Sequence, residues 1–226
     1  MGFGKGLILS AISFLLIISL SLAITLYSAG ILLHSEVYKS SLEKNNFYSQ
    51  FGNELENESK QAIDSSLESF LSYIRGNSDS VGDLEFLQVS GMDSSKLEQV
   101  KSYVNISKRV FYGSIAASFI LIILIFLVSR DFFSSAKIFG ADLFLVGIST
   151  IISVIAAKPI LNNTLSKNAG QEGFEFIKNL VSDLFSGIFA KMNFFGYLTL
   201  GVGAIIFVAF WFLKRRNAPK TEETKI

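Results

Sequence analysis

The sequence predicts an all-α membrane protein, a four-transmembrane-helix bundle with a small helical cap outside the membrane. Two observations indicate this fold class. Half of the 226 residues are hydrophobic and the mean hydropathy is strongly positive, which soluble domains rarely show. The hydrophobic residues also form four runs of about 20 residues, the length that a helix needs to cross a bilayer core of roughly 30 Å.

The four predicted spans cover residues 7–33, 110–128, 138–157 and 194–213. No run alternates in polarity as a membrane β-strand does, and lipid cannot satisfy free backbone groups, so each run is predicted to be a helix. The first run has a second interpretation as a cleaved signal peptide, because Lys5 precedes it and Tyr27-Ser28-Ala29 resembles a cleavage site. A signal core usually holds only about 7–15 apolar residues, which favours an uncleaved anchor.

Basic residues near the span ends predict that both termini are cytoplasmic in a multi-pass protein of the cell membrane. Lys and Arg accumulate on the cytoplasmic side of membrane proteins. With four spans, the basic residues on the side of the termini are Lys5, Arg130, Lys137, Lys214, Arg215, Arg216 and Lys220. The opposite side carries fewer near its span ends, namely Lys108, Arg109 and Lys158.

This topology divides the chain into five segments. They are an N-terminal stub with the first span (1–33), an extracytoplasmic helical cap (34–109), a hairpin of the second and third spans (110–158), a second extracytoplasmic segment (159–193), and the fourth span with a basic tail (194–226). Membrane lipids are therefore expected partners, and the protein groups available for recognition lie mainly outside.

The cap is predicted to contain two helices that pack on each other. Apolar residues recur at helical spacing over residues 53–75, and Gly76 follows as a stop signal. A second helix is expected from Ser95, whose spacing to Glu98 fits a capping box, and it continues into the second span without Gly or Pro before Gly113. Between these helices, residues 84–89 resemble a short strand or a hydrophobic plug.

The second extracytoplasmic segment contains an amphipathic helix over residues 174–192. Its apolar stripe includes Phe176, Ile177, Leu180, Leu184, Phe185 and Ile188. Such a helix either lies in the headgroup plane or covers the cap. The polar face is not distinctly basic, which favours packing against the cap, and the stripe is a candidate interface or lipid-facing surface.

The side-chain inventory argues against catalysis. The chain has no Cys and a single His, His34, so thiol chemistry and thiolate metal sites are excluded. No phosphate-binding loop, dinucleotide fingerprint or zinc-protease helix is present. We therefore expect no enzyme activity, no cofactor and no metal. Because the cap is net acidic and the basic tail is short, we also expect no nucleic-acid partner.

Asp142 is the one acidic residue within a predicted span. One interpretation is an interfacial carboxylate that reaches headgroup water, or that pairs with Lys137 or with the basic tail. The other is an intramembrane polar contact or ion-binding group, because ionisable residues in spans often mark a pathway.

Small residues in the spans are candidate helix-packing positions. Gly113 and Ala117 form a small-x-x-x-small pattern in the second span, and Gly196 and Gly201 thin one side of the fourth. Three glycosylation sequons, at Asn57, Asn105 and Asn162, all fall outside under the predicted topology. Asn57 is farthest from the membrane and is the favoured acceptor.

Several short stretches carry a resemblance to a known family. They are Phe47-Tyr48, Leu71-Ser72-Tyr73-Ile74-Arg75-Gly76, Phe86, and Lys96-Leu97-Glu98-Gln99-Val100-Lys101 before the second span. With the order of spans and loops, they resemble a family of uncharacterised bacterial four-span membrane proteins with a helical extracytoplasmic region after the first span. The chain departs from that family at Met92-Asp93-Ser94, where a His-containing helix start is expected. The resemblance implies a fold and no activity.

The function predicted from these observations is non-enzymatic. We expect the extracytoplasmic cap to mediate contact with another membrane or extracytoplasmic protein, or to stabilise a membrane assembly. A small channel or transporter subunit, or a lipid-handling protein that uses the apolar face of residues 174–192, is the alternative.

Overall fold

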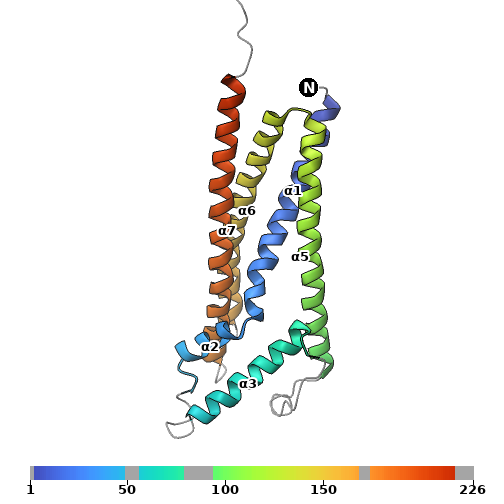
Figure 1. Cartoon of the computed structure of the whole chain (residues 1–226). Helices are drawn as coiled ribbons and strands as arrows, with labels where there is room; N and C mark the ends of the chain where they lie inside the picture. The colour runs from blue at the N-terminus through green and yellow to red at the C-terminus, as the bar shows by residue number, and fades with distance from the viewer. Residues whose placement is uncertain (1–2, 49–55, 79–93, 168–173, 217–226) are drawn as a thin grey trace, which may run out of the picture. The chain divides into compact units, whose positions relative to one another are not determined.

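The computed structural model describes residues 3–48, 56–78, 94–167 and 174–216. Within these ranges the chain forms six α-helices and one 3-10 helix, and no strand (Figure 1). The elements are α1 (Phe3–Ala29), η1 (Gly30–Leu33), α2 (Ser35–Lys44), α3 (Glu56–Arg75), α5 (Ser94–Ser129), α6 (Phe132–Lys167) and α7 (Phe174–Arg216). The predicted all-α class is confirmed.

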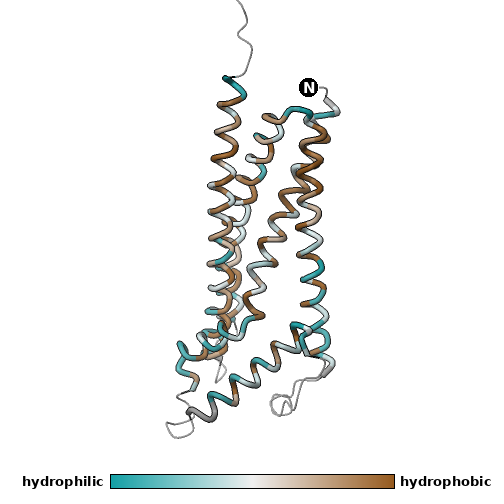
Figure 2. The backbone as a smooth tube through the Cα atoms, viewed as in Figure 1, coloured by the Kyte–Doolittle hydropathy of each residue, from teal (hydrophilic) through white to brown (hydrophobic). Residues whose placement is uncertain are grey.

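Four of the helices are long and apolar enough to cross a membrane. The apolar stretches extend over Gly4–Leu33, Ser95–Ser129, Phe132–Lys167 and Glu175–Arg216, and each contains one predicted span. Figure 2 shows hydrophobic residues along most of the length of these helices and hydrophilic residues alternating along α3. The chain is therefore a multi-pass membrane protein.

The chain divides into two compact units. The first unit comprises residues 1–24, 113–153 and 193–226, and the second comprises residues 25–112 and 154–192. All four long helices contribute to both units. The contacts described below lie within one unit or the other.

In the first unit, α1 packs against α5 and α6. The buried core here consists of Ile12, Leu16 and Ile125, with Ile138 and Phe139 of α6 against it. Hydroxyl groups add polar contacts between the helices. The Ser19 hydroxyl donates a hydrogen bond of 2.8 Å to the Ser114 carbonyl, and the hydroxyls of Ser21 and Ser149 lie 3.1 Å apart. Such bonds stabilise helix pairs in lipid by about 0.6–2 kcal/mol each.

Helices α6 and α7 approach each other at four glycines. A Cβ atom added to Gly140 would lie 2.6 Å from the Phe207 nitrogen, and one added to Gly147 would lie 2.6 Å from the Gly196 carbonyl oxygen. On α7, a Cβ added to Gly203 would lie 2.7 Å from the Gly140 carbonyl oxygen. Real Cβ atoms do not come this close, so the backbones touch only because these side chains are absent. Each helix spaces its two glycines seven residues apart, the repeat of a heptad seam.

The second unit contains two buried clusters. In one, Tyr73 and Ile74 of α3 pack against Leu97 of α5, with Leu33 and Val104 beside them. This contact confirms that the helices predicted around residues 53–75 and from Ser95 pack on each other. The other cluster joins α6 and α7 to the end of the first span, and its members are Val154, Ile188, Phe189, Met192, Ile31, Leu32, Ala157 and Leu161.

Helix α3 ends where the sequence predicts. Gly76 has φ of +80°, a conformation that costs glycine little and other residues more. Its N–H bonds to the Tyr73 carbonyl and the Asn77 N–H bonds to the Ser72 carbonyl, both at 3.0 Å. This pair of bonds is the Schellman motif, which satisfies carbonyls at a helix end.

Two helices continue beyond the ends that the sequence predicts. Helix α6 does not end near Pro159 but continues through it to Lys167, although proline has no N–H to offer the Ile155 carbonyl. Packing outweighs this loss, because Ala157 and Leu161 on either side both contact the buried cluster of the second unit. Helix α7 likewise runs without a break at Asn193, so the predicted amphipathic helix and the fourth span are one helix of 43 residues.

The predicted cap agrees with the structure in one further helix and differs in another. Helix α5 begins at Ser94, one residue before the predicted start, and runs unbroken through the second span, as expected. Helix α2 lies in the predicted cap, where the sequence analysis proposed no helix. The stretch at residues 84–89, expected to be a strand or plug, lies outside the described residues.

The glycine contact predicts a large difference between two neighbouring substitutions on α7. Gly203→Ala places a methyl group against the α6 backbone, whereas Gly201→Ala meets no atom within 4 Å. We expect Gly203→Ala to lower the free energy of unfolding by about 1–3 kcal/mol. Gly201→Ala should be neutral or slightly stabilising, because alanine favours helix. Thermal unfolding in detergent measures both, and equal midpoints would contradict the packing argument.

Candidate functional site

Asp142 of α6 is buried in the first unit, with only 4% of its surface exposed. The Ser13 hydroxyl hydrogen-bonds its carboxyl group, while Oδ2 has no hydrogen-bond partner. A hollow of about 440 Å³ lies beside it, lined by Gly6, Leu9, Ser10, Ser13, Phe14, Ile17, Ile138, Asp142 and Leu145. The geometry is that of a polar contact between α1 and α6 rather than of a carboxylate reaching headgroup water.

The basic partners expected for Asp142 lie elsewhere. The Lys137 ammonium group lies 5.7 Å from the centre of the Phe207 ring. In the basic tail, Lys214 forms an ion pair of 3.1 Å with Asp131. The acidic residue that pairs with the tail is therefore Asp131, in the turn between α5 and α6.

Asp131 organises this turn, which consists of only two residues. Arg130 adopts a left-handed conformation with φ of 57°, and its N–H bonds to the Phe126 carbonyl at the end of α5. Asp131 then acts as the N-cap of α6, because Oδ1 accepts a hydrogen bond of 3.2 Å from the Phe133 N–H. The sequence analysis missed this role, although an Asp directly before an apolar run is a recognised helix-start signal.

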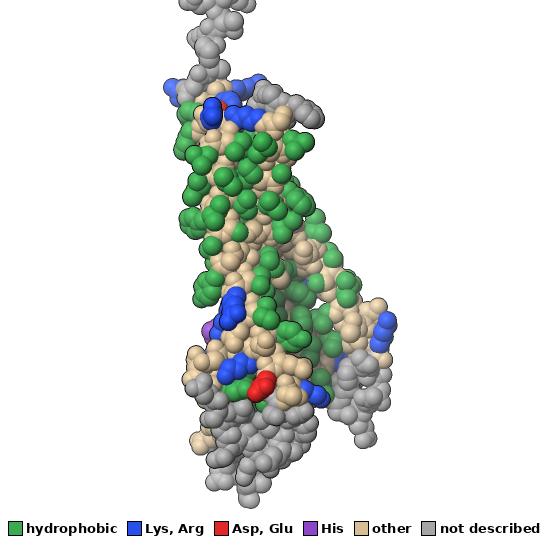
Figure 3. Space-filling view, turned by 90° about the vertical axis from the view of Figure 1, so that its right-hand side faces the viewer, with side chains coloured by type: hydrophobic (Ala, Val, Ile, Leu, Met, Phe, Trp, Pro, Cys, Tyr) green, Lys and Arg blue, Asp and Glu red, His purple; other side chains and the backbone are tan. Residues whose placement is uncertain are grey.

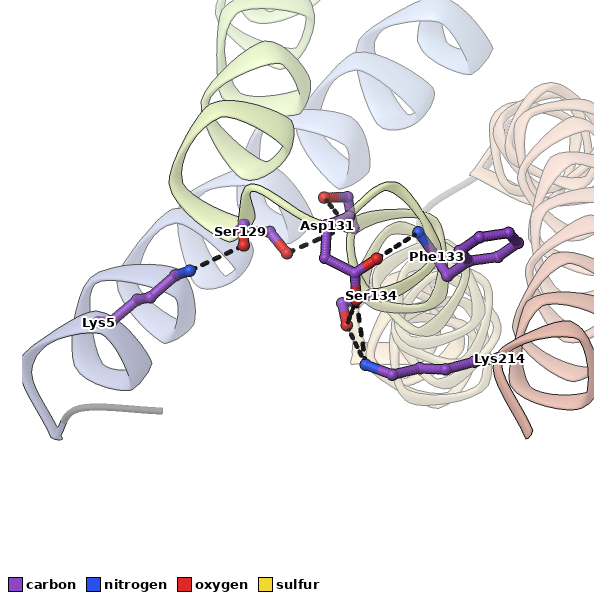
Figure 4. A network of polar contacts seen from close by, with 7 residues as sticks. Lys5, Ser129, Asp131, Phe133, Ser134 and Lys214 are labelled. Carbon is purple, nitrogen blue, oxygen red and sulfur yellow. Dashed lines mark hydrogen bonds and ion pairs between the residues drawn. The ribbon is translucent and has the colours of Figure 1, made fainter. Parts of the chain in front are cut away.

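Lysines from both terminal helices reach the same turn (Figure 4). Lys214 of α7 contacts Asp131 and the Ser134 hydroxyl. Lys5 of α1 donates a hydrogen bond of 2.7 Å to the Ser129 carbonyl. The Ser134 and Lys214 hydrogen bonds hold the pKa of the Asp131 carboxyl below its usual range. The turn is thus a polar contact point for four helix ends of the first unit, the start of α1, the end of α5, the start of α6 and the end of α7.

The small residues proposed for helix packing have different surroundings. Gly196 packs against α6, with Ile151 and Thr150 near the position of a Cβ. Gly113 and Gly201 face open space within 4 Å, and Ala117 is partly buried. On α5, the small residues next to Gly113 and Ala117 that are buried are Ser114 and Ser118. The glycines that form the α6–α7 contact with Gly196 are Gly140, Gly147 and Gly203.

The apolar stripe of residues 174–192 is divided between packing and exposure. Leu184 and Ile188 are buried, whereas Ile177 is 52% exposed. Phe176 and Leu180 are half-buried, and Phe185 remains partly exposed. The Phe176 ring stacks on Phe47 with 4.9 Å between centroids. These contacts pack this part of α7 against residues of the predicted cap.

A polar cluster joins the same part of α7 to α2. Asp183 accepts hydrogen bonds from Lys44 and from the Asn45 side-chain amide, the latter at 3.0 Å. The Ser41 hydroxyl lies 3.4 Å from the same carboxylate. Asp183 therefore anchors the C-terminal end of α2.

A second polar contact joins the chain after α2 to α3. The Tyr48 hydroxyl donates a hydrogen bond of 3.0 Å to Asp64, and the tyrosine is buried. Burial, followed by the Asp64 contact, raises the pKa of Tyr48 to about 12. Asp64 also lies 3.7 Å from the Lys39 ammonium group of α2. It therefore joins α3 both to α2 and to Tyr48 after α2.

The three sequons lie in helices. Asn57 falls in the first turn of α3, Asn105 in α5 and Asn162 in α6. Asn162 is exposed and Asn105 is half-buried. A glycosylation acceptor normally lies in a surface loop, and none of these three positions has that setting.

An apolar stripe on α5 remains exposed before the second predicted span. Its members are Val100, Tyr103, Ile106 and Val110, which are between 40% and 66% exposed. Tyr103, Ile106 and Val110 lie on the side of the helix away from Leu97 and Val104, the residues that pack against α3, and Val100 lies between the two sides. Figure 3 shows one face of the molecule, on which hydrophobic side chains cover the long helices and basic side chains gather near helix ends.

Neither a metal-binding site nor a similar known protein indicates the family of this chain. Among the described residues, no group of three His, Asp or Glu side chains is placed to hold a metal ion. Comparison with protein-family models, with characterised proteins and with solved structures finds no match. The resemblance to uncharacterised bacterial four-span proteins therefore stays a prediction from the sequence.

The unpartnered oxygen of Asp142 predicts an unusual substitution effect. Asp142→Leu removes a buried polar group without a complete set of hydrogen bonds and keeps the branching of the side chain, with a hollow beside it for the added volume. We expect it to raise the free energy of unfolding by about 1–2 kcal/mol. Denaturation in detergent measures the change. A loss of stability would show that the Ser13 contact outweighs the cost of burying the carboxyl group.

The Tyr48 contact predicts a stability difference at high pH. Tyr48→Phe should lower the free energy of unfolding by about 1 kcal/mol below pH 10, because the bond to Asp64 is lost. Tyr48 ionises near pH 10 when unfolded and at about 12 when folded, so its contribution is complete below pH 10 and is lost as the pH rises toward 12. Denaturation at pH 8 to 11 should show the gap between the two proteins closing, and a constant gap would contradict the assignment.

Proposed function

We propose that this chain is a non-enzymatic multi-pass membrane protein whose helices α2 and α3 lie outside the cytoplasm and whose extracytoplasmic surface binds another protein. The proposed orientation places both termini in the cytoplasm. It is supported by the number of basic residues near Lys5, Arg130 and Lys214, and by the contacts that Lys5 and Lys214 make beside one turn.

The observation that carries the binding proposal is the exposed stripe of Val100, Tyr103, Ile106 and Val110 on α5. A helix rises about 1.5 Å per residue, so Tyr103 precedes the start of the predicted span at Val110 by roughly 10 Å. Lipid tails do not reach a side chain at that distance. Tyr103 is nevertheless 66% exposed, so lipid does not account for its exposure. Contiguous exposed apolar groups outside the bilayer are typical of protein-binding surfaces.

The chemistry of the stripe favours a helical partner. Its residues recur at three- and four-residue intervals along a continuous helix, which is the pattern by which one helix face meets another. Arg109 lies exposed beside the stripe and adds a positive charge at its membrane end. We therefore propose an amphipathic or spanning helix of a second membrane protein as the occupant, with an acidic residue near Arg109.

A photocrosslinking experiment tests this proposal. A benzophenone side chain placed at Tyr103 of the full chain in native membranes should yield one crosslinked product of constant mass. The matched control is Glu98, which is also exposed on α5 but lies on a different side of the helix. Tyr103→Ser combined with Ile106→Ser should reduce the yield of a crosslink from Val110 by roughly tenfold. Monomer alone at Tyr103, or equal products at Tyr103 and Glu98, would contradict the proposal.

A further inference from the structure

A hollow in the second unit combines apolar walls with basic side chains. Its volume is about 350 Å³, within the usual range of small-molecule sites. It is formed by the end of α1, by η1, by α5 and by one side chain of α7. The residues that line it are Leu26, Tyr27, Ala29, Gly30, Leu32, Leu33, His34, Val104, Ser107, Lys108, Phe111 and Lys191.

The charged groups of this hollow all have one sign. These groups are the ammonium groups of Lys108 and Lys191, and no lining residue is acidic. The Lys108 ammonium group donates a hydrogen bond of 2.7 Å to the Arg75 carbonyl, and that of Lys191 lies 5.5 Å from the centre of the Tyr27 ring. Neither lysine forms an ion pair with a carboxylate of the described residues. A carbonyl and a ring orient the two charges without neutralising them, so the hollow attracts an anion.

The walls of the hollow suit a hydrocarbon chain. Leu26, Leu32, Val104 and Phe111 contribute apolar surface, and the Phe111 ring stacks on Tyr27 with 6.1 Å between centroids. Gly30 keeps one side open, since a Cβ added there would meet no atom within 4 Å. An inorganic anion would gain no binding free energy from contact with this apolar surface, whereas a hydrocarbon chain would.

The depth of the hollow along the helices matches the headgroup layer. Leu33 is the last residue of the first predicted span, and Lys108 lies two residues before the second. Lipids present a phosphate directly above their acyl chains at this level, and basic pockets at span ends recognise anionic headgroups. The juxtaposition of paired lysines and an apolar wall is therefore complementary to one amphiphile.

We propose that this hollow is a binding site for one anionic phospholipid. Lys108 and Lys191 bind the headgroup phosphate, and one acyl chain lies along the apolar wall past Gly30. Ser107 also lines the hollow and adds a polar side chain beside the two lysines.

Native mass spectrometry of the purified full chain in neutral detergent tests the headgroup part. Phosphatidylglycerol and phosphatidylcholine with identical acyl chains are added separately. We expect one retained phosphatidylglycerol and at least roughly tenfold weaker retention of phosphatidylcholine. Lys108→Gln combined with Lys191→Gln should abolish this preference. The control is Lys158→Gln, which changes a basic residue near a span end that does not line the hollow, and it should retain the lipids as the unmodified protein does.

A second variant tests the chain-binding part and does not depend on the lysines. Gly30→Leu adds a side chain at a position that lines the hollow and where a Cβ meets no atom within 4 Å, and it should remove lipid retention, whereas Gly113→Leu, at another glycine facing open space, should not. Because Lys108 also holds the end of α3, unfolding midpoints are compared in lipid-free detergent. If the double variant does not fold, Lys191→Gln and Gly30→Leu decide the outcome.

Three results would overturn the proposal. They are equal retention of the two lipids by the unmodified chain, unchanged retention in both Lys191→Gln and Gly30→Leu, or full displacement of phosphatidylglycerol by millimolar inorganic phosphate. The last result would identify a simple anion site in which the apolar wall has no part.

Discussion

The backbone contact between α6 and α7 is the constraint on which the packing of the first unit depends. Helices in lipid gain little from burying apolar side chains, so association relies on close contact and hydrogen bonds. Gly140 and Gly147 on α6 face Gly203 and Gly196 on α7, and their equal spacing keeps both contacts on one seam. Once this seam is fixed, the remaining faces of α6 are determined. The face that carries Asp142 and Ser149 meets α1 through Ser13 and Ser21.

Basic side chains in both units complete the ends of other helices. Lys5 donates to the carbonyl of Ser129, the last residue of α5. Arg75 donates a hydrogen bond of 2.7 Å to the carbonyl of Leu33, the last residue of η1, and Lys108 donates to the carbonyl of Arg75, the last residue of α3. The end of a helix carries free carbonyls and a partial negative charge, so these contacts satisfy both hydrogen bonding and charge. Lys5 and Lys108, which the sequence analysis counts as orientation signals, therefore also stabilise helix contacts, each within its own unit.

Hydropathy predicted the number and position of the spans but not the length of the helices. A hydropathy window measures transfer to lipid, so it stops at Lys158 and at Asn193, where α6 and α7 continue. The sequence likewise identified small residues in the spans, but not which of them face a neighbouring helix. Gly201 and Gly203 are two residues apart and so point to opposite sides of α7, and only the partner helix shows that Gly203 is the packed one. Asp142 was recognised as unusual, yet its contact with Ser13 requires the relative rotation of α1 and α6, which no periodicity in either helix supplies.

The two-residue turn between α5 and α6 also limits how the two helices can move. Arg130 and Asp131 span at most about 7 Å when extended, so the end of α5 and the start of α6 stay close together in any conformation of the chain. The two helices can tilt about this turn, but sliding of one along the other is limited to about one or two helical turns of 5.4 Å each. Any movement that separates the opposite ends of α5 and α6 must therefore be a rotation about Arg130 and Asp131.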